Sequence, residues 1–188
     1  ANVTYHFSML ATMTLVPILV EEGFGKSPLY VTIVLLPSQS LGLFMPMIAG
    51  WIYDKYQPRF LRLWCMLLIA GGFIVLSQVA PVASFWALPL IMIPISIGTN
   101  MFNPVNNAMI MNALPLEHRG VASGMLETSR EIGHALGATG AALILGLAMP
   151  AGVERLPFEV SRVFFLEGFQ VSTLAVVGTL LFGALLVY

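Results

Sequence analysis

The sequence predicts an all-α membrane protein with six transmembrane helices. Apolar residues make up 58% of the 188 positions and charged residues only 9%, against roughly 25% charged in soluble domains. The apolar residues gather in stretches long enough to cross a hydrocarbon core of about 30 Å, which takes about 20 helical residues. We expect these spans at residues 3–20, 29–51, 61–80, 86–113, 120–149 and 167–187.

Short polar breaks separate the expected spans, and six spans place both chain ends on one side of the membrane. The breaks are expected at residues 21–28, 52–60, 81–85, 114–119 and 150–166. The second and fourth loops, with their edges, carry Lys55, Arg59, Arg62 and Arg119. The opposite side carries Lys26, Arg155 and Arg162. This small excess of basic residues favours a cytoplasmic location for those two loops and for both termini.

Composition also excludes several classes of function. The net charge of −1 comes without any basic run, so no nucleic-acid partner is expected. Three scattered histidines and the single Cys65 lack the spacing of metal ligands, and Cys65 in its apolar run reads as a buried, inert thiol. No nucleophile with its base and no phosphate-binding loop is visible. We therefore expect no enzyme activity, no metal and no cofactor.

The first span carries polar residues among its apolar ones, and Tyr5 is our candidate for a solute cavity there. His6 could titrate near neutral pH, or it could be an interfacial histidine beside the lipid headgroups, which is the simpler interpretation. Met9 and Met13 are expected to pack against other helices, although soft side chains also suit an adaptable apolar pocket.

Prolines interrupt the second and fourth spans. Pro37 and Pro46 lie in the second span, and Pro89, Pro94 and Pro104 lie in the fourth. Each removes a backbone donor and bends its helix, which membrane bundles tolerate when neighbouring helices satisfy the freed carbonyls. These bends are structural features that could also serve as hinges in a moving bundle.

The fourth span has one polar face. The polar residues recur every three or four positions, as Ser96, Thr99, Asn100, Asn103, Asn106 and Asn107. Buried amides in hydrocarbon need partners, either on neighbouring helices or in a wet cavity. The stripe is longer than helix packing requires, so we expect cavity lining, with Asn100, Asn103 and Asn107 as the candidates.

The fifth span holds four ionisable residues within an arc of about 100°: Glu127, Arg130, Glu131 and His134. Arg130 lies roughly 15 Å along the helix, near the bilayer midplane, where a charge costs roughly 2.5–3.5 kcal/mol. Such residues usually face a protein interior or a water-filled route, so a transport protein is the first hypothesis. One alternative is a neutralised arginine at a helix interface; the other is proton coupling, with Glu127 as the preferred carrier. The pairs Gly120/Gly124 and Gly133/Gly137 both have the spacing of close helix contacts.

The second loop reads Gly50-Trp51-Ile52-Tyr53-Asp54-Lys55-Tyr56-Gln57-Pro58-Arg59. It resembles the loop signature G-x-x-x-D-[RK]-x-G-x-[RK] of the major facilitator superfamily, with Gln57 at the second glycine. The resemblance implies a gating loop made by Gly50, Asp54, Lys55 and Arg59, in which an acid and bases latch one conformation. A solvated charge run at the membrane edge is the simpler alternative.

Two further segments resemble the same superfamily. Residues 115–124, with Pro115, Arg119, Gly120 and Ser123-Gly124, are similar to its P-x-x-x-R-G-x-A-S-G junction. Residues 129–137 are similar to the R-x-x-G-x-x-x-G run of its drug:proton antiporters, especially the fourteen-helix type. The resemblance implies that residues 1–188 form the C-terminal six-helix half of a longer transporter, with the N-terminal half missing. It also implies that the first and fourth helices line the cavity.

These observations predict a secondary active transporter that moves a small organic solute or drug by alternating access. The expected direction is efflux, in exchange for protons. Its expected partners are the solute, protons, the lipid bilayer and the missing half. We expect it in the bacterial inner membrane with both termini cytoplasmic. A membrane scaffold or signalling protein without transport activity is the alternative function.

Overall fold

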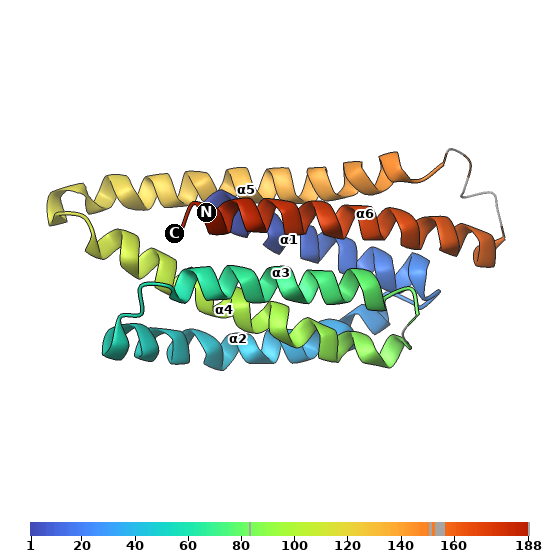
Figure 1. The fold of residues 1–188 in the computed structure, drawn as a ribbon, viewed down its shortest axis with the longest axis horizontal. Helices are drawn as coiled ribbons and strands as arrows, with labels where there is room; N and C mark the ends of the chain where they lie inside the picture. Colours follow the sequence, from blue (N-terminus) through green and yellow to red (C-terminus); the bar gives the residue numbers. More distant parts are fainter. Residues whose placement is uncertain (83, 151, 153–156, 188) are drawn as a thin grey trace.

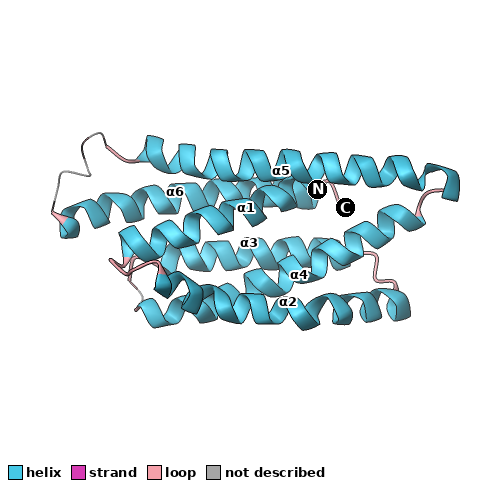
Figure 2. Cartoon of the chain, turned by 180° about the vertical axis from the view of Figure 1, so that it is seen from behind, coloured by secondary structure: helices cyan, strands magenta, loops and turns pink. Residues whose placement is uncertain are grey.

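The computed structural model describes residues 1–82, 84–150, 152 and 157–187. Within these ranges the chain is a bundle of six long helices without a strand (Figures 1 and 2). Each helix is long and apolar enough to cross a membrane, which confirms the predicted fold class. The helices are α1 Asn2–Ile18, α2 Leu29–Tyr56, α3 Leu61–Val79, α4 Leu88–Asn112, α5 Arg119–Ala148 and α6 Phe158–Leu185.

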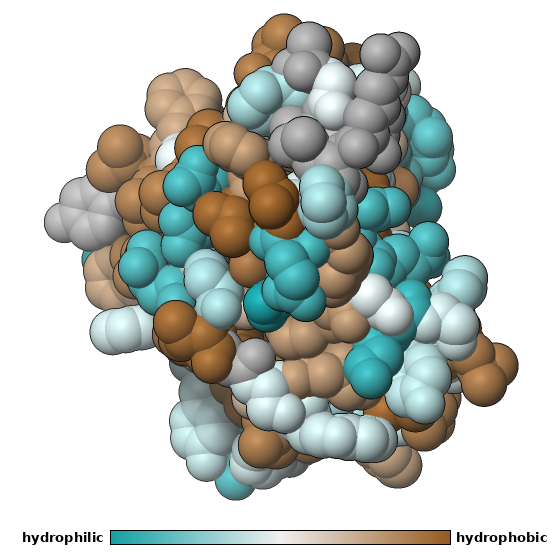
Figure 3. All heavy atoms as spheres, turned by 90° about the vertical axis from the view of Figure 1, so that its right-hand side faces the viewer, coloured by the Kyte–Doolittle hydropathy of each residue, from teal (hydrophilic) through white to brown (hydrophobic). Residues whose placement is uncertain are grey.

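Successive helices run in alternating directions, so the α2–α3 and α4–α5 connections lie at the same end of the bundle, the left-hand end in Figure 1. The closest packing is between α1 and α5, between α4 and both α2 and α3, and between α3 and α6. Large aromatic side chains fill the core between these pairs, among them Tyr5, Phe73, Phe102 and Phe169. Cys65 is buried there too, as predicted. Figure 3 shows the opposite end of the bundle, where hydrophilic side chains gather between apolar ones.

Two helix boundaries differ from the sequence prediction. α6 begins at Phe158, nine residues before the expected start at 167, so the loop predicted at 150–166 is shorter. Arg162 is tolerated in this first part of α6 because its Nε donates to the Gly23 carbonyl oxygen at 2.7 Å. Arg155, which entered the charge count of the loops, lies outside the described residues.

α2 also extends further than expected, to Tyr56. Gly50, Asp54 and Lys55 are therefore on the helix, and only Arg59 lies in the connection to α3. The helix ends where Gln57 takes a left-handed conformation with φ of 40°, and the Gln57 N–H donates to the Tyr53 carbonyl oxygen at 2.9 Å. A glycine is the usual residue for this cap because it has no Cβ to clash, which gives a physical reason for the glycine in the signature.

Only one of the two glycine pairs on α5 packs against another helix in this chain. A Cβ on Gly133 would lie 2.6 Å from the Val3 carbonyl oxygen of α1, and a Cβ on Gly137 would collide with the backbone of Phe7. The prediction for Gly133 and Gly137 is thus confirmed. For Gly120 and Gly124 it stays a prediction, since among the described residues nothing lies within 4 Å of a Cβ built on either.

Candidate functional site

A cavity of about 80 Å³ opens between α1, α2 and α4. We call it the polar cavity, and it is lined by Met9, Thr12, Met13, Leu35, Ser38, Gln39, Met92, Ile95, Ser96, Thr99 and Asn100. The sequence predicted walls from the first and fourth helices. It missed the third wall, on α2, because the polar residues there form one short run, Ser38-Gln39-Ser40, and not a stripe with helical periodicity.

The hydroxyl groups that α1 and α4 contribute to the polar cavity are already used as donors. Thr12 donates to the Ser8 carbonyl oxygen at 2.7 Å, Ser96 to that of Met92 at 2.9 Å, and Thr99 to that of Ile95 at 2.6 Å. A hydroxyl that donates to its own helix keeps lone pairs free. These groups can therefore accept hydrogen bonds from a solute or water.

Asn100 lies on the cavity wall, whereas the other predicted cavity residues lie elsewhere. Its Nδ2 donates to the Ser96 carbonyl oxygen at 2.9 Å. Its Oδ1 points toward α2, where a Cβ built on Gly42 would lie 3.2 Å away. Asn103 is half-buried and does not line the polar cavity.

Tyr5 lies in the core and does not line the polar cavity. Its ring stacks on Phe102 with centroids 4.4 Å apart, and its hydroxyl donates to the Thr99 carbonyl oxygen at 2.8 Å. Only 2% of the residue is exposed. Its contact with the backbone of α4 fixes α1 beside the cavity wall without reaching the cavity itself.

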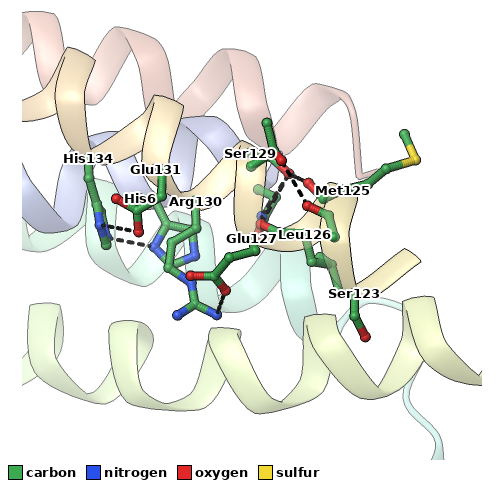
Figure 4. Close-up of polar contacts among 12 residues, drawn as sticks. His6, Ser123, Met125, Leu126, Glu127, Ser129, Arg130, Glu131 and His134 are labelled. Carbon is green, nitrogen blue, oxygen red and sulfur yellow. Dashed lines mark hydrogen bonds and ion pairs between the residues drawn. The ribbon is translucent and has the colours of Figure 1, made fainter. Parts of the chain in front are cut away.

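The charged face of α5 forms a second hollow, of about 280 Å³, against α4. Arg130 Nη2 and Glu127 Oε2 are 2.7 Å apart, which confirms that one helix can partly neutralise its own charges (Figure 4). The two side chains remain 37% and 55% exposed within this chain. The hollow is completed by Asn107, Met111, Ser123 and Leu126.

His134 connects this face to α1. Its Nε2 lies 3.1 Å from Nδ1 of His6, and its Nδ1 lies 3.8 Å from Glu131 Oε1 (Figure 4). His6 is only 3% exposed, so the interpretation as an interfacial histidine is wrong. A hydrogen bond between two imidazoles needs a proton on one nitrogen and a lone pair on the other. The sequence showed both histidines but could not show that α1 turns one toward the other.

Asn106 serves helix packing and lies away from the polar cavity. Its Nδ2 donates to Asn2 Oδ1 at 3.2 Å, and its Oδ1 accepts from Arg62 Nη1 at 3.3 Å. Asn2 in turn donates to the Leu126 carbonyl oxygen at 3.2 Å. Asn106 thus joins α4 to α1 and α3, and Asn2 extends the connection to α5. This is the interhelical role that the sequence left open for the polar face of the fourth span.

The predicted gating residues are exposed at the end of α2. Lys55 Nζ lies over the Trp51 ring at 5.0 Å and over the Tyr56 ring at 5.3 Å, and Arg59 lies over the Phe60 ring at 5.1 Å. Within the described part of the chain, no salt bridge joins Asp54 to a basic side chain. Its carboxylate is therefore available to a group outside this bundle.

Comparison with known protein families shows to which family the chain belongs. Residues 2–138 match the Major Facilitator Superfamily. The chain belongs to this superfamily. The six apolar helices make it an integral membrane protein of a transporter family. The motifs at 50–59 and 115–124 lie inside the matched region, so the resemblance noted in the sequence is confirmed.

Three known proteins are similar to the chain. The uncharacterized transporter YebQ of Escherichia coli is 30% identical over 73% of this chain and 30% of its own length. The tetracycline resistance determinant of Streptomyces rimosus is 23% identical over 82% of this chain and 44% of its own length. The methylenomycin A resistance protein of Streptomyces coelicolor is 25% identical over 75% of this chain and 30% of its own length. The chain thus spans less than half the length of each, and no solved structure is a significant match.

Proposed function

We propose that this chain is the C-terminal half of a secondary active transporter that exports a small organic solute by alternating access. The observation that carries the proposal is the polar cavity, which lies among three helices near the middle of their length, and carriers bind their solutes near the bilayer midplane. Its walls combine soft apolar side chains with hydroxyls and an amide. Binding sites for organic molecules have this mixture of apolar surface and a few polar groups.

The size of the polar cavity supports a site shared with a second bundle. A drug-sized molecule needs roughly 300–1,000 Å³, whereas this cavity holds about 80 Å³. Three helices of this chain would then supply one wall of the binding site and the missing N-terminal half the other. The length of the relatives, of which this chain spans 30–44%, is consistent with such a half.

Proton coupling is the finer part of the proposal. The pair of Glu127 and Arg130 stays partly exposed in this chain, and Asn107 lies beside it. Protonation of Glu127 would release Arg130 from its partner, which would bias one conformation of the bundle over another. The relatives named for resistance to tetracycline and methylenomycin support drug export as the direction. The cellular setting we propose is the bacterial inner membrane, with cytoplasmic termini.

The test is flux through the full-length protein in proteoliposomes, measured for a panel of organic solutes with and without a pH gradient. The proposal predicts transport of at least one solute and acceleration when the gradient is applied. Flux that is the same with and without the pH gradient would exclude proton coupling. Absence of flux for every solute, with correctly inserted protein, would favour a scaffold or signalling role.

A further inference from the structure

We propose that Ser38 and Gln39 of α2 are specificity-determining residues, which select an uncharged, hydrogen-bonding group on the transported solute. This inference rests on the proposed function and names the class of solute that the polar cavity takes. The decisive feature is the difference between Ser38 and the other hydroxyl residues around the polar cavity.

Ser38 has a buried hydroxyl oxygen with no hydrogen-bond partner among the described residues. Serines and threonines in membrane helices commonly donate to the carbonyl four residues back, and Thr12, Ser96 and Thr99 do so here. Ser40, two residues further along α2, donates to the Leu36 carbonyl oxygen at 2.8 Å. The helix therefore permits this bond, and Ser38 does not make it.

A buried hydroxyl without a partner is costly, so a group that supplies the missing bond is favoured at this position. Ser38 lies about 14 Å along α2 from Leu29, close to the middle of a hydrocarbon core of about 30 Å. Bulk water is remote at that depth unless a cavity admits it. Ser38 lines the polar cavity, but its hydroxyl oxygen is covered in this conformation. A change of its χ1 rotamer would bring the oxygen to a solute or water in the cavity.

Gln39 and Asn100 extend the same recognition surface. Gln39 lines the cavity, and its amide makes no hydrogen bond to another described residue. Asn100 uses its Nδ2 on the Ser96 carbonyl oxygen, which leaves Oδ1 as an acceptor facing α2. Ser38 can donate and accept, the Gln39 amide can do both, and Asn100 can accept. Together they match an amide, hydroxyl or keto group.

The uncharged lining that this chain supplies disfavours an ionic solute group beside Ser38 and Gln39. None of the described residues that line the polar cavity is charged. An ionic group held at this depth without a counter-charge is strongly disfavoured. The charged pair Glu127 and Arg130 belongs to the separate hollow beside Asn107, two helical turns or about 10 Å along α4 from Asn100. The solute group and the coupling charges therefore occupy different places.

The experiment compares Ser38→Ala and Gln39→Leu with the matched control Ser40→Ala in the full-length transporter in proteoliposomes. The probes are chloramphenicol, which is uncharged and carries an amide and hydroxyl groups, and ethidium, a permanent cation. We expect chloramphenicol to be transported in preference to ethidium. KM for chloramphenicol should rise about 3- to 10-fold in Ser38→Ala, the effect of one lost hydrogen bond, with the maximal rate and the control unchanged.

The outcomes separate this inference from the proposed function. If the unaltered protein transports solutes but KM is unchanged in both Ser38→Ala and Gln39→Leu, or if it prefers ethidium, the assignment of α2 is wrong while the transporter proposal stands. If the unaltered protein transports neither probe nor any solute of the wider panel, both fail. Immunoblots of the reconstituted vesicles control for the amount of inserted protein.

Discussion

The contact between α1 and α5 gives a sharp prediction, because it depends on two positions without side chains. Replacing Gly133 by alanine would place a Cβ 2.6 Å from the Val3 carbonyl oxygen and 2.7 Å from the His6 Cβ. Ordinary contacts between such atoms are roughly 3.5–4.0 Å, so α1 and α5 must move apart. Overpacking of this kind costs about 1–3 kcal/mol.

Gly178 of α6 is the matched control, because nothing lies within 4 Å of a Cβ built on it. Both glycine-to-alanine changes raise helix propensity equally, by about 1 kcal/mol in water. The difference in stability between the two variants therefore measures the cost of overpacking alone. Thermal unfolding of the purified protein in detergent should show a Tm for Gly133→Ala about 2–10 °C below that of Gly178→Ala. Equal Tm values would refute the close α1–α5 contact.

Four further changes test other parts of the structure. Gln57→Gly should raise the free energy of unfolding by about 1 kcal/mol, measured by denaturation in detergent, because glycine adopts the left-handed cap without strain. Asn106→Ala should lower it by about 1–3 kcal/mol, since Arg62 and Asn2 lose their shared partner; an unchanged value would mean the junction carries no stability. Asp54→Asn in the full-length protein should reduce flux while immunoblots show normal insertion, and unchanged flux would remove this residue from gating. Arg130→Ala should lower expression more than specific activity if the pair with Glu127 serves packing, and the reverse if it serves coupling.

The sequence was sufficient for the number of helices, because runs of apolar residues are read directly from composition. It was less reliable at the start of α6, where Glu159 and Arg162 dilute the apolar signal. Arg162 is accommodated there by the carbonyl oxygen of Gly23, 139 residues away along the chain. A contact that distant in sequence leaves no local trace, so the boundary could not be predicted.

The candidate site was predictable where it depends on helical periodicity. The spacing of polar residues on α4 correctly indicated that Asn100 and Asn107 lie on faces that border hollows. Periodicity gives the face of one helix but not its rotation against the next, so the partner of His6 and the burial of Tyr5 were missed. Ser38 was missed for another reason: its significance lies in a hydrogen bond that it does not make.

The most direct test of the central claim, that the polar cavity belongs to a water-filled solute pathway, is the reactivity of a cysteine at Asn100 in the full-length protein. Asn100→Cys and the control Leu174→Cys, on an exposed part of α6 at similar depth, are treated with a membrane-impermeant maleimide in native membranes. The buried Cys65 should not react. We predict labelling of Asn100→Cys, slowed by a transported solute, and no labelling of Leu174→Cys. An unreactive Asn100→Cys in a correctly inserted protein would contradict the account.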